Sequence, residues 1–196
     1  MKKFLLLNCF LFSIFPGWSQ AWTKNYDQVD ACDCRIYKVS KNDKFGYTDD
    51  KGNLIIPLIY DDGMSFSEGR AAIMIAKKWG FIDSAGNEIV KPQYTEVYSF
   101  HEGLAVVSKG DTFGFIDLNG KLIIPLIYTN AKSFGSQLAP VCNSKNVWGY
   151  INKANKVSIP FQFNYADSFS EGTARVMKGG KWVYIDSLGK IVKVND

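Results

Sequence analysis

The chain has 196 residues, of which 46% are hydrophobic, 21% charged and 15% aromatic, and this balance excludes a disordered or collagen-like chain. Its net charge is +4, and setting aside two lysines in a segment expected to be removed leaves 21 cations against 19 anions. Neither a nucleic acid nor an anionic membrane surface is therefore expected as a partner. The single histidine, His101, excludes metal sites built from several histidines.

An export signal opens the chain. Two lysines at positions 2–3 precede an apolar run over 4–15, which a Pro-Gly pair at 16–17 ends. Small residues at 19 and 21 fit cleavage after position 21. The apolar run is shorter than the roughly 20 residues that a membrane-spanning helix needs, and no second run of spanning length follows. We expect residues 1–21 to be a signal peptide and the mature protein, without a membrane span, to be periplasmic, at the cell surface or secreted.

Three cysteines remain after the signal peptide: Cys32, Cys34 and Cys142. An odd number in an exported protein permits one disulfide and leaves one thiol over. Cys142 with either partner is as possible as a Cys32–Cys34 bridge. The spacing does not resemble a zinc site, and no metal or other cofactor is expected.

A repeat of about 34 residues dominates the rest of the chain. An aromatic residue, usually followed by glycine, recurs at steps of 34, 34, 35 and 34 residues. The pairs are Phe45-Gly46, Trp79-Gly80, Phe113-Gly114, Trp148-Gly149 and Trp182-Val183.

Each recurring position has a predicted structural role. A glycine with positive φ closes a hairpin between two short strands, and an aspartate three residues earlier accepts hydrogen bonds from the turn. A proline then ends the second strand, and after Ser-Phe and Glu-Gly steps a third strand follows. The glycines are Gly52, Gly86, Gly120 and Gly189; the aspartates are Asp49, Asp83, Asp117 and Asp186; the prolines are Pro57, Pro92, Pro125 and Pro160.

These patterns predict an all-β fold, an array of five three-stranded repeats with almost no helix. The β-repeat domain covers 22–196: a half unit at 22–43, four units at 44–77, 78–111, 112–146 and 147–180, and a half unit at 181–196. Because two half units could complete each other, a propeller-like closed ring is favoured over an open β-solenoid. Pairing of 26–40 with 181–194 would establish the ring.

The repeat resembles the WG-repeat family of bacterial proteins, also seen as Lys-Trp-Gly repeats. The resemblance rests on Trp/Phe-Gly-Tyr/Phe-Ile-Asp-x-x-Gly, then Ile-Pro, Tyr and Phe-x-Glu-Gly-x-Ala, and covers residues 44–190 well. It implies an all-β repeat, often behind an export signal, with variable copy number and no common enzymatic activity. Local departures are Thr48 for isoleucine, Asn152 and Asn155 for the turn residues, Ser136-Gln137 for Glu-Gly, and Val183 for glycine.

The residues that could carry chemistry recur with the unit, which favours a structural role. A glycosidase needs two carboxylates about 5–10 Å apart across one cleft, whereas each aspartate here is explained by its own turn. We therefore predict no catalytic residue and no enzyme. The aromatic column, with Trp79, Trp148 and Trp182, is interpreted as packing between units rather than as a sugar-binding ladder.

Binding specificity is expected in the columns that vary between units. The loop after the recurrent tyrosine has two such positions, separated by a small or apolar residue that we expect to face inward. The variable residues are Asp62, Met64, Glu96, Tyr98, Asn130, Lys132, Tyr165 and Asp167. We predict a non-enzymatic binding module of the cell envelope with a protein partner; the alternatives are a glycan- or peptidoglycan-binding module and, less favoured, a carboxylate-dependent hydrolase.

Overall fold

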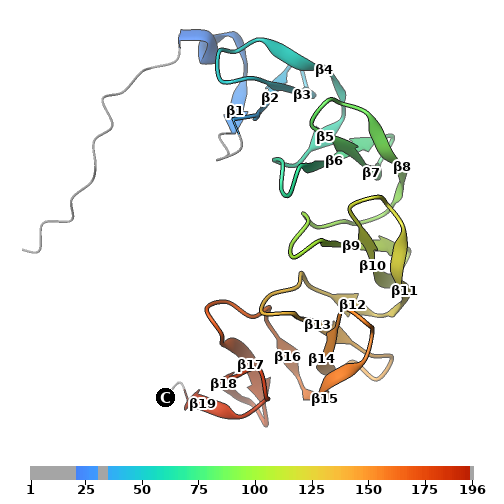
Figure 1. Ribbon diagram of the computed structural model, residues 1–196, viewed down its shortest axis with the longest axis vertical. Helices are drawn as coiled ribbons and strands as arrows, with labels where there is room; N and C mark the ends of the chain where they lie inside the picture. The colour runs from blue at the N-terminus through green and yellow to red at the C-terminus, as the bar shows by residue number, and fades with distance from the viewer. Residues whose placement is uncertain (1–20, 31–34, 195–196) are drawn as a thin grey trace, which may run out of the picture.

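The computed structural model describes residues 21–30 and 35–194, which form five β-sheets in sequence order (Figure 1). Apart from strands, the described residues contain one short 3-10 helix, η1 (Ala21–Asn25), and no α-helix. The all-β array of five units is thus confirmed. Residues 1–20, where the signal peptide is expected, and the cysteines at 32 and 34 lie outside the described residues.

The first two sheets have four antiparallel strands each, arranged in chain order. The first sheet comprises β1 (Gln28–Asp30), β2 (Tyr37–Lys41), β3 (Lys44–Thr48) and β4 (Leu54–Tyr60). The second comprises β5 (Asp62–Gly63), β6 (Arg70–Ile75), β7 (Lys78–Asp83) and β8 (Glu88–Tyr94).

The remaining sheets repeat this order, although the first strand of the third sheet is reduced to a single bridge between Val97 and Val107. The third sheet comprises β9 (Leu104–Lys109), β10 (Thr112–Asp117) and β11 (Leu122–Tyr128). The fourth comprises β12 (Asn130–Ala131), β13 (Leu138–Cys142), β14 (Trp148–Asn152) and β15 (Val157–Phe163). The fifth comprises β16 (Tyr165–Ala166), β17 (Ala174–Lys178), β18 (Lys181–Ile185) and β19 (Ile191–Val194). Each unit therefore has a short strand in addition to the three that the sequence predicts.

The five sheets follow one another along an open arc (Figure 1). The last strands of the first four sheets, β4, β8, β11 and β15, lie along its convex rim. The short first strands lie at the opposite edge of each sheet, toward the concave side. The arrangement of radial four-stranded sheets is propeller-like.

The expected closure of the ring is wrong for the described residues. The segment with β1 and β2 pairs with β3, and β19 pairs with β18, so each terminal sheet is completed by its own neighbouring strands. Each sheet joins the second half of one predicted unit to the first half of the next. Five complete sheets then form without any exchange between 26–40 and 181–194, and the terminal sheets lie apart (Figure 1).

The Asp-x-x-Gly turns form as the sequence predicts. In the second sheet, Asp83 Oδ1 accepts hydrogen bonds from the backbone N–H groups of Ala85 (2.9 Å) and Asn87 (2.8 Å). Gly86 has φ of 83°, in the left-handed region that glycine adopts without strain. In the fourth sheet, the side-chain oxygen of Asn152 accepts the two equivalent hydrogen bonds, from the backbone N–H groups of Ala154 and Lys156, both at 3.0 Å. The asparagine in place of aspartate therefore keeps the turn.

The recurrent prolines do not end their strands, in contrast to the sequence prediction. Pro57 lies in the middle of β4, which continues to Tyr60, and the pairing of β3 with β4 is irregular on both sides of Tyr47. A bulged edge strand tolerates a residue that cannot donate a hydrogen bond, because the proline nitrogen needs no partner there.

The bulge also explains the glycine after the recurrent aromatic residue. A Cβ added to Gly46, Gly80, Gly114 or Gly149 would lie under 3.0 Å from backbone atoms of the proline-containing strand. The fifth sheet has Val183 at this place, and Val183 pairs directly with Val194 in a strand that lacks proline. Glycine and proline therefore form one structural unit, and the fifth sheet lacks both.

The core consists of four interfaces between successive sheets. We call the face of a sheet that contacts the following sheet its trailing face, and the opposite one its leading face. An isoleucine or valine on each trailing face is almost completely buried. These residues are Ile56 (1% exposed), Val90 (6%), Ile124 (0%) and Ile159 (1%).

Each interface also contains an aromatic pair at the same place in the repeat. Tyr47 packs on Phe66 with ring centroids 5.0 Å apart, and Phe81 packs on Phe100 at 5.1 Å. The pairs Phe115–Phe134 and Tyr150–Phe169 repeat this contact at 5.0 Å. Three of these pairs are edge-to-face and Tyr150–Phe169 is tilted, and such contacts add to the free energy gained by burial of the rings.

The Trp/Phe column contributes less to these interfaces than expected. Phe113 and Trp148 are buried, whereas Phe45, Trp79 and Trp182 are only half-buried. Most ring pairs between sheets instead involve the aromatic residue two positions later, as in Tyr47–Phe66 and Phe81–Phe100, and only Trp148 of the column pairs with a ring of the next sheet, that of Tyr165.

Candidate functional site

The eight residues of the variable columns lie along the concave edge of the sheets, on or beside the short first strands. The residues between each pair are buried, as predicted: Gly63, Val97, Ala131 and Ala166. Tyr98 is 41% exposed and Tyr165 36% exposed. The alternation of a short strand thus anchors the intervening small residues in the core and leaves the variable side chains exposed or half-buried.

Two of the predicted residues line a hollow of about 330 Å³. Its lining includes Tyr98 from the third sheet, Lys132 and Ser133 from the fourth, and Ser168 from the fifth. The hydroxyl of Ser168 donates a 2.6 Å hydrogen bond to the carbonyl oxygen of Ser133, which joins two neighbouring sheets at this place. A hollow shared by three sheets is a place where a ligand would contact several repeats at once.

An ion network lies beside the hollow. Lys132 Nζ is 2.8 Å from Asp167 Oδ1 and donates to the Tyr165 hydroxyl at 2.6 Å. Arg175 Nε is 3.2 Å from the other carboxylate oxygen of Asp167. Partial burial acts to raise the pKa of Asp167, but the hydrogen bonds and charges of Lys132 and Arg175 outweigh it and hold the pKa below its ordinary value.

Aromatic rings support the two cations. Lys132 Nζ lies 3.8 Å from the centroid of the Tyr165 ring, and the Arg175 guanidinium lies 4.3 Å from that of Trp182. Tyr165 in turn contacts Trp148 (5.7 Å) and Trp182 (5.5 Å). The protein's own cations therefore occupy ring surfaces that a neutral sugar would need for stacking.

Four residues of this site were not among the sequence candidates in a binding role. Ser133 and Ser168 recur in every unit, so they carried no signal of function. Trp182 was assigned to the core alone. Arg175 did carry a signal: it stands where the three preceding sheets have Ala72, Val106 and Pro140, although the first sheet has Lys38 at the same place.

The other four candidates are not part of the hollow. Met64 packs against the core between the second and third sheets, and Asp62 accepts a hydrogen bond from the adjacent Gly63 N–H at 2.7 Å. Glu96 and Asn130 are exposed. The structure therefore brings together Tyr98, Lys132, Tyr165 and Asp167 and leaves the remaining four apart.

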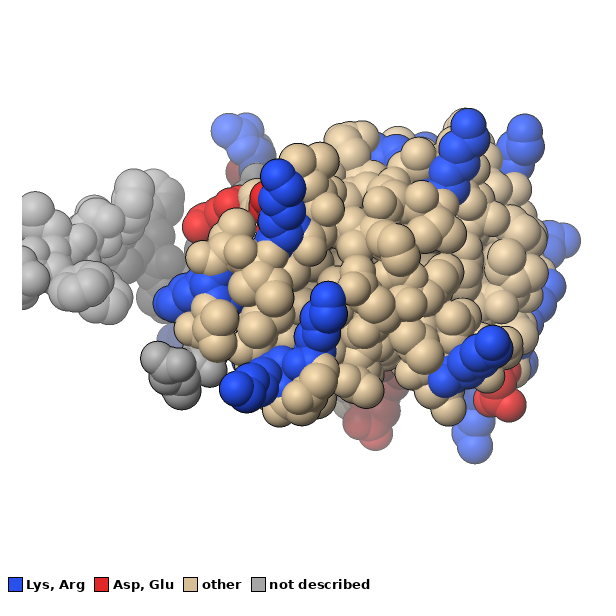
Figure 2. Space-filling model, turned by 90° about the horizontal axis from the view of Figure 1, so that it is seen from below, with Lys and Arg blue, Asp and Glu red and all other residues tan. Residues whose placement is uncertain are grey.

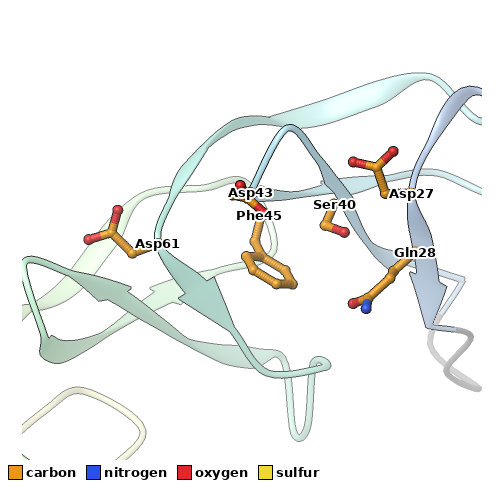
Figure 3. Close-up of a pocket in the computed structure, with 6 residues that line it drawn as sticks. All are labelled: Asp27, Gln28, Ser40, Asp43, Phe45 and Asp61. Carbon is orange, nitrogen blue, oxygen red and sulfur yellow. The ribbon is translucent and has the colours of Figure 1, made fainter.

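A second hollow, of about 310 Å³, lies at the first sheet and is lined in part by Asp27, Asp43 and Asp61 (Figure 3). Asp27 and Asp61 lie at opposite ends of it, with Phe45 between them. Asp27 accepts from the Asn42 N–H (2.8 Å), and Asp61 from the Ala76 N–H (2.7 Å). Both carboxylates thus hold the hairpin of their own sheet, which explains them without a catalytic role.

The described residues lack two features that would identify a class of protein. No group of three His, Cys, Asp or Glu side chains there is placed to hold a metal ion. No helix in the same residues is long and apolar enough to cross a membrane. Cys142 is buried in β13, 3.7 Å from the carbonyl oxygen of Asn143. The fold and the site together define an open, propeller-like repeat array with a polar and aromatic hollow on its concave side.

The chain belongs to the family described as WG containing repeat. The family model matches four times, over residues 45–79, 79–112, 113–146 and 148–182. The resemblance seen in the sequence is thereby confirmed. No curated protein sequence matches the chain.

Solved structures are similar in fold at low sequence identity. The computationally designed Ika8 protein is 10% identical with a TM-score of 0.55, over 85% of this chain and 61% of that one. KlHsv2 with loop 6CD replaced by a Gly-Ser linker is 12% identical with a TM-score of 0.51, over 82% and 62%. The WD40 beta propeller domain of Doa1 is 11% identical, with a TM-score of 0.46 over 86% and 68%. The chain thus spans about three fifths of the first two structures.

Proposed function

We propose that this protein is an exported, non-enzymatic binding module of the cell envelope that holds a protein partner on the concave side of its arc. The observation that carries the proposal is the hollow lined by Tyr98, Lys132, Ser133 and Ser168. Tyr98 and Lys132 occupy a column that differs in every unit, while the surrounding framework repeats. Variable side chains on a repeated framework are where a repeat protein acquires specificity.

A protein partner fits this hollow better than a neutral glycan. The rings of Tyr165 and Trp182 are covered by Lys132 and Arg175, so few aromatic surfaces remain for stacking on sugar. Tyr98 stays exposed, and tyrosine combines apolar area with a hydroxyl, as protein interfaces favour. The signal peptide expected at 1–21 supports a partner outside the cytoplasm.

Co-sedimentation with isolated cell envelopes tests the proposal. The chain from Trp22 onward, which contains all five sheets, is mixed with envelopes that are untreated, stripped of protein by protease, or treated with muramidase. Binding that is lost only after protease supports a protein partner. Binding that is lost only after muramidase favours the wall polymer, and absence of binding contradicts the envelope placement.

A pair of variants links binding to the hollow. Tyr98→Ala is expected to weaken co-sedimentation and leave the melting temperature near that of wild type, because the side chain is exposed. Ile127→Ala is the matched control, since Ile127 belongs to the same sheet, is 57% exposed and lies in β11 on the convex rim. Equal loss in both variants would show that the concave side is not the binding surface.

A further inference from the structure

We propose that the hollow beside Lys132 is a carboxylate-binding site, occupied by an acidic side chain of the partner. This inference rests on the proposed function, because it names the chemistry that the partner presents. It starts from the charges of the ion network. Asp167 is shared by Lys132 and Arg175, so one anion stands between two cations.

The surplus positive charge is next to the hollow. Lys132 contributes to its lining, and its side chain keeps 24% of its exposure. An ammonium group has three N–H donors. Lys132 donates hydrogen bonds to the Tyr165 hydroxyl and to Asp167 Oδ1. A ligand carboxylate at this place would extend the alternation of charge and form a charge-assisted hydrogen bond.

The rest of the lining suits the same group. Ser133 lines the hollow, and a serine hydroxyl can donate to a carboxylate oxygen. Tyr98 supplies an apolar wall on the side of the third sheet, which fits the methylene groups of a glutamate. Because the three contributing sheets are fixed to one another by their cores, the site is formed before the ligand arrives.

The surrounding surface favours an acidic partner. Between Asn130 and Phe163 the chain has four lysines and no aspartate or glutamate. Figure 2 shows the end of the arc with the fourth and fifth sheets from below, a different face from the concave side, and more Lys and Arg than Asp and Glu are visible there as well. A field of one sign increases the rate at which a partner of opposite charge finds the surface.

Calorimetric titration with hexaglutamate tests the site, and hexaglutamine is the neutral probe of the same shape. Lys132→Met is expected to weaken hexaglutamate binding about tenfold or more, the loss typical of a hydrogen bond to a charged group. Asp167→Asn is expected to strengthen it, because the competing carboxylate is removed from Lys132 and Arg175. Lys132→Arg keeps the cation and should retain binding. Loss of stability alone would weaken hexaglutamate binding in both variants. It would not give weaker binding by Lys132→Met together with stronger binding by Asp167→Asn.

Lys145→Met is the matched control, since Lys145 is an exposed lysine of the same sheet in the hairpin between β13 and β14. Urea unfolding of each variant shows that it is folded. Equal binding of hexaglutamine, unchanged binding by Lys132→Met, or an equal effect of Lys145→Met overturns the proposal. So does binding of muramic-acid-containing wall fragments with the same dependence on Lys132 in the absence of hexaglutamate binding, because the carboxylate would then come from a glycan.

Failure of this inference is distinct from failure of the proposed function. If Lys132→Met sediments with envelopes as wild type does, while binding remains protease-sensitive, the carboxylate site is wrong and the protein-binding module stands. If wild type binds hexaglutamate with the expected variants but does not sediment with envelopes, the site stands and the envelope placement is wrong.

Discussion

At the scale of single residues, Thr48 is a local departure from the repeat that weakens the core. The other sheets have isoleucine in this column, and all of these are buried: Ile82, Ile116, Ile151 and Ile185. The hydroxyl of Thr48 is also buried and has no hydrogen-bond partner among the described residues. A polar group that is buried without a hydrogen-bond partner destabilises the folded state, because nothing compensates for the hydration that it has lost.

Thr48→Val is therefore expected to stabilise the protein by about 1–2 kcal/mol, because valine has the same shape without the hydroxyl. Urea unfolding followed by circular dichroism measures the change. Thr48→Ser, which keeps the hydroxyl and removes the methyl group, should destabilise. A less stable valine variant would mean that the hydroxyl has a partner outside the described residues.

The turn aspartates predict how stability depends on pH. The side-chain amide of Asn87, followed by its backbone N–H, holds the pKa of Asp83 below its ordinary value of 3.8. A carboxyl whose pKa is lowered by folding stabilises the protein above the unfolded pKa, and this contribution is lost as the pH falls through the folded pKa. Stability should therefore decrease on acidification below about pH 4.

Asp83→Asn isolates this contribution, because Asn152 shows that an asparagine can accept the same backbone hydrogen bonds. The variant should be less stable than wild type at neutral pH, and the difference should shrink as acid protonates Asp83. Urea midpoints at neutral and acidic pH measure it. A difference that is equal at both pH values would show that the charge of Asp83 has no part in stability.

At the scale of elements, the glycine and the proline of each unit act together. Gly114 faces the backbone of Ile124 and Pro125 so closely that a Cβ would lie under 3.0 Å from both. Gly114→Ala should destabilise the protein by about 1–3 kcal/mol, since backbone atoms cannot move aside as a flexible side chain can. Thermal unfolding measures the loss.

Gly103→Ala is the control for the loss of a glycine alone. Gly103 has φ of 82° but nothing within 4 Å of an added Cβ, so its substitution reports the backbone strain without a clash. If Gly114→Ala keeps wild-type stability, β11 must be able to straighten as β19 does next to Val183.

The sequence predicts elements well where a cause is local. The Asp83 turn depends on residues within four positions, so its hydrogen bonds follow from the motif. The role of Pro57 does not follow from its own motif, because the partner strand decides whether a proline ends a strand or lies in a bulge. Arg175 could have been found by comparing units, since it follows Ala72, Val106 and Pro140 in its column, whereas Ser133 and Ser168 could not, because they do not vary.

Closure of the ring could not be predicted for a similar reason. The small rotation between successive sheets adds up along the arc, and it is set by side-chain packing at each interface rather than by the length of the repeat. Five units of the same length can therefore form an open arc or a ring.

At the scale of the whole molecule, the two ends of the arc differ from the interfaces within it. At the leading face of the first sheet, the Trp22 side chain covers Gly52, where inside the arc Ile56 of the preceding sheet covers Gly86. At the trailing face of the fifth sheet, Lys193 pairs with Tyr184. This is the position that Ile124 occupies in the third sheet, where it pairs with Phe115. A buried aliphatic position has thus become an exposed cation.

Arg175 changes the same face in the same way. It is exposed where Ala72 and Val106 are buried, and its guanidinium covers the ring of Trp182 while Lys193 Nζ lies 5.7 Å from the ring centroid of Tyr184. A face with two cations over its aromatic rings resists contact with another apolar sheet face, because both charges would lose their hydration.

The double variant Arg175→Val/Lys193→Ile should therefore self-associate, because it restores an apolar trailing face, whereas wild type should remain monomeric. Size-exclusion chromatography with light scattering over a range of concentrations measures the mass. Lys190→Ile is the control, since Lys190 is an exposed lysine of the same hairpin outside the aliphatic column. If the double variant stays monomeric, or if wild type associates and Lys193→Glu separates it, the cations of this face do not prevent association.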